Sequence, residues 1–452
     1  MSDEALSFDV IVLGGGMAGS SAAGYAASRG VSVCLIEKAP ELGGSALLSG
    51  GWVWTAPTYA VMRDRAPDGD AHLQRVFMDR WPRAIEWIRS TGVQMSEERT
   101  PPLPWGKGFS LDILGFIQRC AAMVESAGGF VFRSTVTERI VVENGKVAGV
   151  VVRTQGETAL LRASNVVLAT GGFQADRSLL YEQFGENARQ ILLRSNVHSA
   201  GDGLRLALAV GADTAGDMST FYGHLIAWPV MEFEPKDFQR FSLSGYSLQG
   251  LLLDLACERF TDESFGHQSN AIAVAKRPHA RAAVLIDDAK RARVSSALGT
   301  DKLEDSRRAG ARVATSLDLD GIAAALASWE FDTRKLRSSV DAYNAMIAGI
   351  AIDAQPPRRW NHATCGPGPY HVFEVRPGIT TTQGGLRVDD ASRVLDKSGH
   401  PIQGLFAAGG DVGGFYNGGY AGNLCVCCVF GLTAVDAAFG AKLFTQPEPA
   451  KA

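Results

Sequence analysis

A glycine-rich turn near the start of the chain constrains its fold more than any other feature. The turn, Gly14-Gly15-Gly16-Met17-Ala18-Gly19, follows the apolar segment 8–13 and precedes the small, alanine-rich segment 20–28. Segment 31–36 is again apolar and ends at Glu37. A strand, a helix and a second strand in this order predict a β-α-β unit with parallel strands and a right-handed crossover. The predicted fold class is therefore α/β.

The spacing Gly14-x-Gly16-x-x-Gly19 predicts a dinucleotide site. The first glycine permits a tight turn, the second lets a pyrophosphate approach the backbone, and the third lets helix and strand pack closely. Met17 and Ala18 begin the helix, whose positive end attracts phosphates. Glu37, followed by Lys38, suits the ribose hydroxyls, and its negative charge disfavours the 2′-phosphate of NADP. The alternative is a chance glycine turn, but the complete order of elements favours the dinucleotide.

A second glycine cluster, residues 409–414, follows an apolar segment late in the chain, but no strand and acid come after it. Flavoproteins that also dock NAD usually carry two complete fingerprints. One fingerprint, together with glycine-rich loops far away in the sequence, favours a single FAD bound from end to end.

Composition places the 452-residue chain among ordinary globular proteins, with 46 % apolar and 20 % charged residues. A net charge of −4 without a basic block argues against nucleic acid or an anionic membrane as partner. No apolar run reaches the roughly 20 residues of a membrane span, and the acidic N-terminus predicts no secretory signal. Seven cysteines without paired spacing favour a reducing compartment. These features predict a cytoplasmic protein without an integral membrane span.

The composition of the sequence changes between about residues 223 and 377, where charged residues become more frequent and glycine becomes rarer. We interpret this segment as an inserted domain. The predicted division is a dinucleotide-binding domain over 1–222 and 379–452, interrupted by a cap or substrate domain over 223–378. Helices are expected at 70–91, 110–127, 204–210, 317–327, 333–348 and 424–443, with a β-meander at 130–153.

Several separated blocks carry a family resemblance and occur in the order that the family shows. They are Val10–Gly19, Glu37–Gly51, Val167–Gly172, Ser199–Gly203, Arg259–Glu263, Gly384–Asp389 and Gly404–Gly431. Over nearly its whole length the chain resembles the fumarate reductase and succinate dehydrogenase flavoprotein superfamily, including 3-ketosteroid dehydrogenases and tricarballylate dehydrogenase. The resemblance implies a Rossmann-like FAD-binding domain with an inserted α+β cap domain, and a substrate between flavin ring and cap. Covalent members carry a His that segment 41–51 lacks, so non-covalent FAD is expected.

The resemblance also assigns cofactor contacts. Asp411 is expected at the ribityl hydroxyls of FAD. Asn423 and Leu424 open the last helix, whose positive end can stabilise negative charge at the N1/C2=O side of the reduced ring. The other expected contacts are Ser45, Ser49, Gly50 and Gly51 near the flavin ring and ribityl chain, Thr170 and Gly171 near the adenine-diphosphate side, and Gly44, Val136, Ala169 and Asp202.

Members of this superfamily exchange a hydride at flavin N5 and move a proton on the adjacent carbon, which requires an acid or base opposite the flavin. The proton donor of fumarate reductases, an Arg, follows an Arg-Phe-x-Asn-Glu motif, and ketosteroid dehydrogenases have a Tyr there. Here the motif is Arg259-Phe260-Thr261-Asp262-Glu263, and the same count leads to His267, a residue type that carries protons at neutral pH. The alternative is a surface or supporting His in a loop. His224 occupies the region of a substrate-binding His, or is a hydrogen-bonded His at the domain junction.

Departures from the fumarate reductase pattern argue against dicarboxylate substrates. Ser242-Leu243 occupies the position of a Thr-Glu pair in fumarate reductases. Thr381 occupies the position of a His, and Tyr420 that of an Arg that binds a substrate carboxylate. The segments 49–54 and 419–422, Ser-Gly-Gly-Trp-Val-Trp and Gly-Tyr-Ala-Gly, instead resemble ketosteroid dehydrogenases, in which the Tyr hydroxyl polarises a ketone. Tyr420 is assigned that role, with aromatic packing on the flavin as the alternative. Tyr246, which stands for another Arg, is a further candidate for substrate contact.

The cysteine-rich segment Cys425-Val426-Cys427-Cys428 does not predict a metal site. Its thiols point in different directions in a helix, and no His or Cys partner has zinc spacing. The residues are expected to be small buried side chains.

The predicted function is FAD-dependent desaturation or reduction of a carbon–carbon bond α,β to a carbonyl, as in a cyclic ketone, enone or ketosteroid-like compound. Tyr420 would polarise the carbonyl and His267 would move the proton. One alternative is a fumarate- or tricarballylate-like acid reductase, with charge from Arg259, Arg291 or Arg376. Another is a flavin-binding electron carrier without its own substrate. The expected partners are a small-molecule substrate and an electron donor or acceptor of unknown identity.

Overall fold

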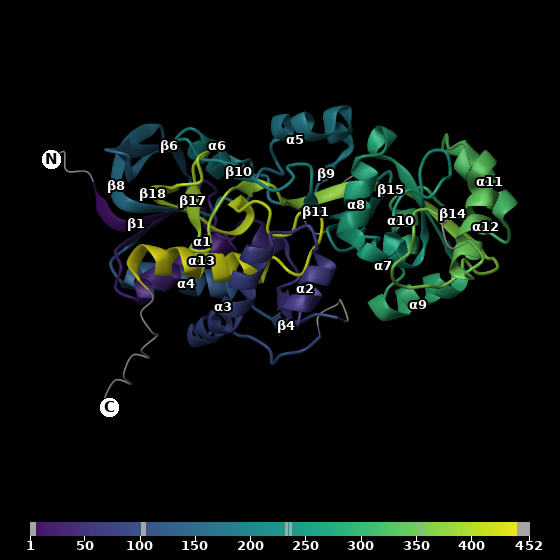
Figure 1. Ribbon diagram of the computed structural model, residues 1–452, viewed down its shortest axis with the longest axis horizontal. Helices are drawn as coiled ribbons and strands as arrows, with labels where there is room; N and C mark the ends of the chain where they lie inside the picture. The colour runs from purple at the N-terminus through teal and green to yellow at the C-terminus, as the bar shows by residue number, and fades with distance from the viewer. Residues whose placement is uncertain (1–5, 101–104, 231–233, 235–236, 352–354, 441–452) are drawn as a thin grey trace.

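The computed structural model describes residues 6–100, 105–230, 234, 237–351 and 355–440. Figure 1 shows a molecule elongated along one axis, in which strand β1 and the last helix, α13, lie in the same part. The opposite part holds helices from the middle of the chain, drawn in green. The long strand β15 (Tyr370–Thr382) runs between the two parts.

The part that contains β1 is built on an eight-stranded sheet with the order β17-β18-β7-β8-β1-β2-β5, in which β6 pairs with β7. The pairs β18–β8, β8–β1, β1–β2 and β2–β5 are parallel. Val10 lies opposite Val33 on one side and Asn165 on the other, so the expected β-α-β unit is present. The strands are β1 (Ser7–Leu13), β2 (Val33–Ile36), β5 (Phe130–Phe132), β6 (Thr135–Glu143), β7 (Lys146–Thr154), β8 (Glu157–Leu168), β17 (Arg393–Leu395) and β18 (Pro401–Ala407).

Helices α1, α4 and α13 approach one another closely because small residues lie at their contacts. A Cβ added at Gly24 of α1 would lie 2.9 Å from Cys120 Cβ of α4, and one at Gly431 of α13 would lie 2.7 Å from the Ala18 carbonyl oxygen. Larger side chains would force these helices apart. The elements besides the sheet are α1 (Met17–Ser28), α2 (Tyr59–Arg65), α3 (Ala71–Ser90), α4 (Ile113–Ser126), α5 (Arg177–Phe184), α6 (Asp202–Leu208), α13 (Leu424–Phe439), β3 (Trp52–Thr55) with β4 (Lys107–Ser110), and β10 (Thr214–Ala215) with β16 (Gly385–Leu386).

A second sheet has the order β11-β15-β13-β12, and β14 and β9 also pair with β15. The predicted domain boundaries, 222/223 and 378/379, fall inside β11 and β15, which pair with each other in antiparallel. The chain therefore passes between the two parts through adjacent strands. The elements are β9 (Leu192–Leu193), β11 (Phe221–Ala227), β12 (Leu251–Leu253), β13 (Ala282–Asp287), β14 (Val313–Ser316), α7 (Ser244–Gln249), α8 (His267–Ala275), α9 (Asp288–Leu298), α10 (Lys302–Arg308), α11 (Leu319–Ser328) and α12 (Leu336–Ile347).

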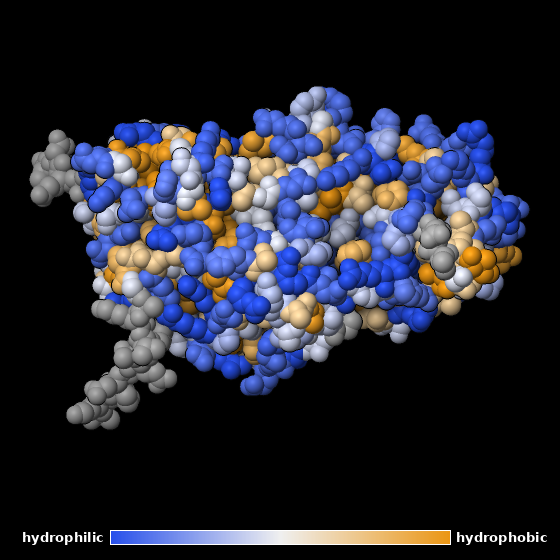
Figure 2. All heavy atoms as spheres, viewed as in Figure 1, coloured by the Kyte–Doolittle hydropathy of each residue, from blue (hydrophilic) through white to orange (hydrophobic). Residues whose placement is uncertain are grey.

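On the face shown in Figure 2, hydrophilic side chains predominate and hydrophobic ones form small patches. Within the described residues, no helix combines the length and the apolar character needed to cross a membrane. Cys425, Cys427 and Cys428 are buried within α13 and form no disulfide. The described His, Cys, Asp and Glu side chains form no group of three or more that could hold a metal ion.

Candidate active site

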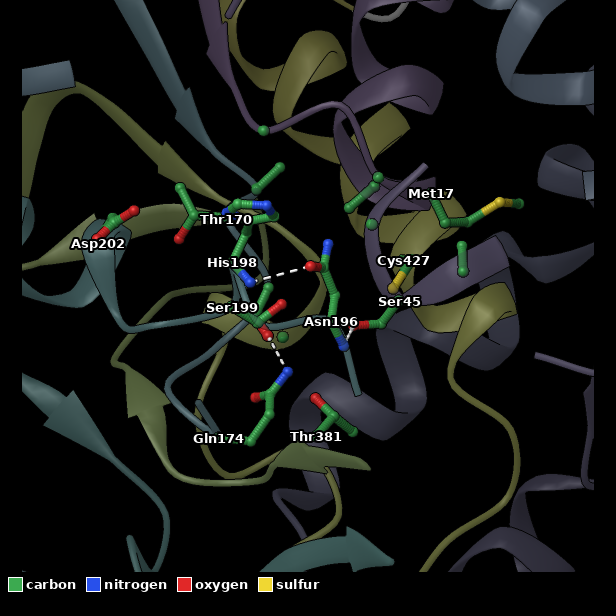
Figure 3. Close-up of a pocket in the computed structure, with 18 of the residues that line it drawn as sticks. Met17, Ser45, Thr170, Gln174, Asn196, His198, Ser199, Asp202, Thr381 and Cys427 are labelled. Atoms are coloured by element: carbon green, nitrogen blue, oxygen red, sulfur yellow. Dashed lines mark hydrogen bonds between the residues drawn. The ribbon is translucent and has the colours of Figure 1, made fainter. Parts of the chain in front are cut away.

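A cavity of about 1170 Å³, partly open to solvent, lies where β1, β2 and β8 end, and Leu13, Ile36 and Ala169 line it. It extends past the beginnings of α1 and α13. Figure 3 shows Met17 and Cys427 on one wall, Thr170 and Asp202 on another, and the loop residues Asn196 and His198 between them. The carboxyl edge of a parallel sheet, next to helix N-termini, is where open α/β folds bind ligands.

The glycines of the first turn create space and close packing at different places. Gly14 has a φ of +102°, and a Cβ on it would lie 2.3 Å from the Ala169 carbonyl oxygen. A Cβ on Gly19 would lie 1.8 Å from the Gly14 carbonyl oxygen, so Gly19 brings the helix against the turn. A Cβ on Gly16 would meet only the Gly43 carbonyl oxygen within 4 Å, at 3.8 Å. The backbone at Gly16 is therefore the part of the turn that is open to a ligand.

Glu37 is held rigidly at the end of β2 and lines the cavity. Its carboxylate accepts hydrogen bonds from the backbone N–H groups of Gly15, at 2.7 Å, and Ala39, at 2.8 Å. The neighbouring Lys38 Nζ donates to Asp202 Oδ2 at 2.5 Å, which ties the start of α6 to this end of the cavity. A fixed carboxylate with lone pairs remaining can accept hydrogen bonds from ligand hydroxyls.

Four aromatic side chains, Tyr222, His224, His267 and Tyr420, form what we call the aromatic–imidazole cluster. The rings of Tyr222 and Tyr420 stack with centroids 3.8 Å apart, and both residues line the cavity. Tyr222 Oη lies 2.8 Å from His224 Nε2, and His224 Nδ1 lies 2.6 Å from Ser242 Oγ. The His267 ring packs against the His224 ring at 4.3 Å. Tyr222 and Tyr420 therefore belong to the cavity wall, and hydrogen bonding extends from the Tyr222 hydroxyl through His224 to Ser242.

Burial controls the protonation of this cluster. Burial, followed by the positive charge of Arg194, lowers the pKa of His267 to about 4. The same two causes, with smaller effects of His267 and Lys302, lower the pKa of His224 well below its usual range. Burial raises the pKa of both phenols. Both imidazoles and both phenols are therefore neutral at pH 7.

The family model described as FAD binding domain matches residues 9–423. This chain belongs to the FAD binding domain family. The prediction that the dinucleotide is FAD is therefore confirmed, and so are the predicted fold class and the superfamily resemblance.

Curated relatives are identical to this chain at about a quarter of the aligned positions. NADH:fumarate oxidoreductase from Klebsiella pneumoniae is 24 % identical over 95 % of this chain and 47 % of its own length. Vinyl phenol reductase from Lactiplantibacillus plantarum is 25 % identical over 94 % of this chain and 93 % of its own length. 4-Oxocyclohexanecarboxylate 2-dehydrogenase from Sinomonas cyclohexanicum is 25 % identical over 92 % of this chain and 89 % of its own length. The chain spans about half of the first relative and nearly all of the other two.

Solved structures confirm the fold. The open conformation of a flavocytochrome c3 fumarate reductase has a TM-score of 0.68 at 22 % identity, covering 96 % of this chain and 78 % of its own. The 3-ketosteroid-Δ4-(5α)-dehydrogenase from Rhodococcus jostii RHA1 has a TM-score of 0.74 at 21 % identity, covering 96 % and 97 %.

The residues that line the cavity suit FAD in their donor and acceptor chemistry. The open backbone at Gly16 and the first N–H groups of α1 suit the pyrophosphate, and Glu37 suits the ribose hydroxyls. Most of the predicted cofactor contacts line this cavity, namely Gly14, Gly16, Met17, Ala18, Glu37, Lys38, Gly44, Ser45, Ser49, Ala169, Thr170, Gly171, Asp202, Asn423 and Leu424. Gly19, Gly50, Gly51, Val136 and Asp411 are not among the lining residues.

Asp411 lies behind the cavity wall, where it binds the turn that follows β8. Its carboxylate accepts hydrogen bonds from the backbone N–H and hydroxyl of Thr170, at 2.5 and 3.0 Å, and from the Gly172 N–H at 3.4 Å. Burial raises its pKa, and these hydrogen bonds oppose the rise. Its observed contacts hold the Thr170–Gly172 turn, and a direct contact with the ribityl chain stays a prediction.

Other residues that line the cavity belong to no sequence motif that would predict a cofactor contact. Asn196 accepts a hydrogen bond from the His198 backbone N–H at 2.9 Å, and its own N–H donates to Ser45 Oγ at 3.3 Å (Figure 3). These residues belong to a loop without a recognisable motif. Only the matched block at Ser199–Gly203 indicated that cofactor contacts lie nearby. The other lining residues not predicted as contacts include Thr135, Thr137, Gln174 and Thr380.

Several other candidate residues have partners away from the cavity. The Tyr246 hydroxyl is 2.9 Å from Ser295 Oγ of α9. Arg259 pairs with the buried carboxylate of Glu263 at 2.7 Å. Arg291 pairs with Asp301 and Asp288, while Arg376 donates to Gln190 and to the His279 carbonyl oxygen. None of these four residues lines the described cavity, so the charge of an acid-binding site would have to come from elsewhere.

The depressed pKa of His267 predicts a pH-dependent loss of stability. Because the pKa is about 4 in the folded state and 6.5 ordinarily, the unfolded state binds the proton more tightly, and stability falls as pH decreases from 6.5 to 4. The full effect is about 3 kcal/mol. Chemical denaturation of wild type and His267→Gln at pH 7 and pH 4.5 should show the variant losing less stability on acidification. Equal losses would contradict a neutral, buried His267.

Proposed function

We propose that this FAD-binding protein reduces or desaturates a carbon–carbon bond α,β to a carbonyl group. FAD, when bound, supplies the two-electron donor or acceptor for such a bond. The observation that carries the proposal is the pair of stacked phenols, Tyr222 and Tyr420, at the wall of the cofactor cavity with imidazoles behind them. They provide a hydrogen-bond donor for a carbonyl and a route for a proton in one place.

Tyr420 is proposed to polarise the substrate carbonyl. Burial keeps the phenol protonated far above neutral pH, so that it can donate a hydrogen bond to an oxygen that gains negative charge. Asn423 and Leu424, three and four residues further on, also line the cavity at the beginning of α13, where the helix dipole favours negative charge.

Tyr222 is proposed to pass the proton between the substrate carbon and His224. When His224 carries its hydrogen on Nε2, it donates to Tyr222 Oη and leaves the phenol hydrogen free to point into the cavity. When the hydrogen is on Nδ1, His224 accepts from the phenol and bonds to Ser242. The two tautomers support proton donation and proton uptake, which a reversible reaction needs.

His267 keeps a proposed role in proton transfer, but as a residue that acts through its neighbour. Its ring contacts His224 and lies 5.9 Å from the Tyr222 ring, and it is not a lining residue of the cavity. The adjacent rings disfavour double protonation, because two imidazolium ions side by side would repel each other, which adds to the effects of burial and Arg194 on His224.

The names of the relatives support a carbon–carbon bond as the site of reaction and leave two substrate types. The name 4-oxocyclohexanecarboxylate 2-dehydrogenase indicates a cyclic ketone that also carries a carboxylate, and the name NADH:fumarate oxidoreductase indicates an unsaturated acid without a ketone. The cavity-lining phenol of Tyr420 favours the ketone type for this chain, with the acid type as the second candidate.

An anaerobic substrate panel tests the proposal. The FAD-loaded protein would be mixed with saturated cyclic ketones, and its reduced form with cyclic enones, unsaturated carboxylates and vinyl phenol. Bleaching by a ketone, or recovery of flavin absorbance with an enone, is the expected result. A folded, FAD-loaded protein whose flavin responds to carboxylates alone would favour the acid reductase. No response to any compound would favour the electron carrier.

A further inference from the structure

Arg194 is a buried cation beside the cavity. It follows β9, and its backbone N–H donates to the Ile379 carbonyl oxygen of β15 at 2.8 Å. The side chain is 4 % exposed. Its Nε donates to the Phe238 carbonyl oxygen at 3.1 Å, and its Nη1 donates to Thr380 Oγ1 at 2.9 Å. Thr380 lines the cavity and Arg194 itself does not, so the guanidinium lies directly behind the cavity wall, one hydrogen bond away from a lining residue.

Sheet register brings Arg194 to the aromatic–imidazole cluster. Leu192 and Leu193 lie opposite Gly378 and Ile379 of β15, while His224 of β11 lies opposite Gly378 on the other side. Side chains two residues apart on a strand share a face, so Thr380, Arg194 and His224 belong to one face. A Cβ on Gly378 would lie 3.0 Å from Ile226 Cγ1 and 3.6 Å from Arg194 Cβ, so the missing side chain lets these residues pack closely against β15.

Arg194 differs from the other buried cations that the structure describes. Lys290 pairs with Asp287 at 3.0 Å, Arg358 pairs with Glu263 at 3.0 Å, and Arg376 lies 3.8 Å from Glu374. Arg194 is as deeply buried, yet it forms no ion pair with any carboxylate among the described residues. A buried charge without a counter-ion is strongly unfavourable, so its partner is expected to come from a ligand.

Among the residues that the structure describes, the groups around Arg194 do not supply the missing negative charge. The interactions that reach it come from the phenols of Tyr222 and Tyr420, which stay neutral, and from two imidazoles. The ammonium of Lys302 adds a second positive charge nearby: burial, followed by the charge of Arg194, lowers the pKa of Lys302, and Lys302 has a small effect on the pKa of His224 after burial, Arg194 and His267. This side of the cavity is therefore electropositive.

We propose that Arg194 binds an anionic group of the substrate, so that the substrate carries a carboxylate in addition to the carbonyl that faces Tyr420. The inference rests on the proposed function and narrows its substrate class to oxo acids, either saturated or α,β-unsaturated. Arg194 would be a specificity residue, which sets the position of the reacting bond by holding one end of the molecule. The competing source of negative charge is FAD itself.

Ligand binding tests the proposal without requiring turnover. Oxo carboxylates and unsaturated carboxylates, each with its methyl ester, would be titrated into FAD-loaded protein and followed by perturbation of the flavin spectrum. Wild type should prefer each acid to its ester. Arg194→Met should bind the acids about 30-fold or more weakly while leaving the esters unchanged, and Arg194→Lys should recover part of the loss. Arg189→Met, which removes a 73 % exposed Arg, serves as the control for loss of charge.

Two further measurements separate the substrate from the cofactor. The FAD affinity of the apoprotein and the reduction potential of the bound flavin, both without carboxylate, should be nearly the same in Arg194→Met and wild type. A large loss of FAD affinity, or a shifted potential with the acid preference intact, would overturn the proposal in favour of a cofactor contact. A wild type with no preference for acids over esters would also overturn it. Neither result would contradict reduction or desaturation of a neutral ketone.

Discussion

Tyr222→Phe is expected to lower kcat by about 10²- to 10⁴-fold, the range of a lost general acid or base, while FAD binding stays unchanged. The substitution keeps the ring that stacks on Tyr420 at 3.8 Å and removes only the hydroxyl that lies 2.8 Å from His224 Nε2. Steady-state kinetics with the substrate found in the panel, together with flavin absorbance per protein, measures both effects.

Tyr416→Phe is the matched control for this experiment. Tyr416 belongs to the same aromatic group, with its ring 5.3 Å from that of Tyr420, but its hydroxyl donates to the Gly422 carbonyl oxygen. Its removal should change stability more than kcat. Comparable losses of kcat in both variants would indicate disturbed packing and would contradict proton transfer through Tyr222.

The variant His267→Gln distinguishes proton transfer by Tyr222 from direct proton transfer by His267. If His267 acts through His224, this variant should lose less activity than Tyr222→Phe and should change the pH dependence of kcat more than its maximum. A larger loss than in Tyr222→Phe would make His267 the direct carrier.

The second large effect is expected from Gly16→Leu, which should weaken FAD binding strongly while the protein still folds. Gly16 has a φ of −78°, which any residue adopts, and its Cβ would meet no protein atom closer than 3.8 Å. A leucine side chain would instead occupy the space of the pyrophosphate. The FAD dissociation constant should rise by about 100-fold or more, equivalent to about 3 kcal/mol. Titration of the apoprotein with FAD, followed by flavin fluorescence, measures the change.

Gly19→Ala is the control that separates folding from binding. Its Cβ would lie 1.8 Å from the Gly14 carbonyl oxygen, so this small change should lower the Tm of the apoprotein, whereas Gly16→Leu should not. Thermal unfolding of both apoproteins by circular dichroism gives the comparison. A yellow Gly16→Leu protein with stoichiometric FAD would contradict the placement of the cofactor against this turn.

Much of the cofactor site was predictable because its determinants are local in the sequence. The turn at Gly14–Gly19, the acid Glu37 and the beginning of α13 each depend on a few consecutive residues with specific backbone geometry. Asn196 and Thr380 line the same cavity without such a pattern, because their place depends on pairing between distant strands.

The substrate side was predicted less completely, for the same reason. Counting from the Arg259–Glu263 motif led to His267, which does belong to the aromatic–imidazole cluster, but not to Tyr222, which lies between the imidazoles and the cavity. The arginines considered from the sequence, Arg259, Arg291 and Arg376, have partners elsewhere in the structure.

The sequence alone indicated the fold class and a dinucleotide cofactor, because a glycine turn with the correct strand, helix and acid is specific for such a site. The presence of a single such unit, together with the family resemblance, indicated FAD. Only the tertiary structure showed which cation lies next to the cavity. Arg194 becomes significant through its burial and its lack of a carboxylate partner among the described residues. Both properties arise where β9 and β11 pair with the two sides of β15, and no local pattern in the chain encodes that juxtaposition.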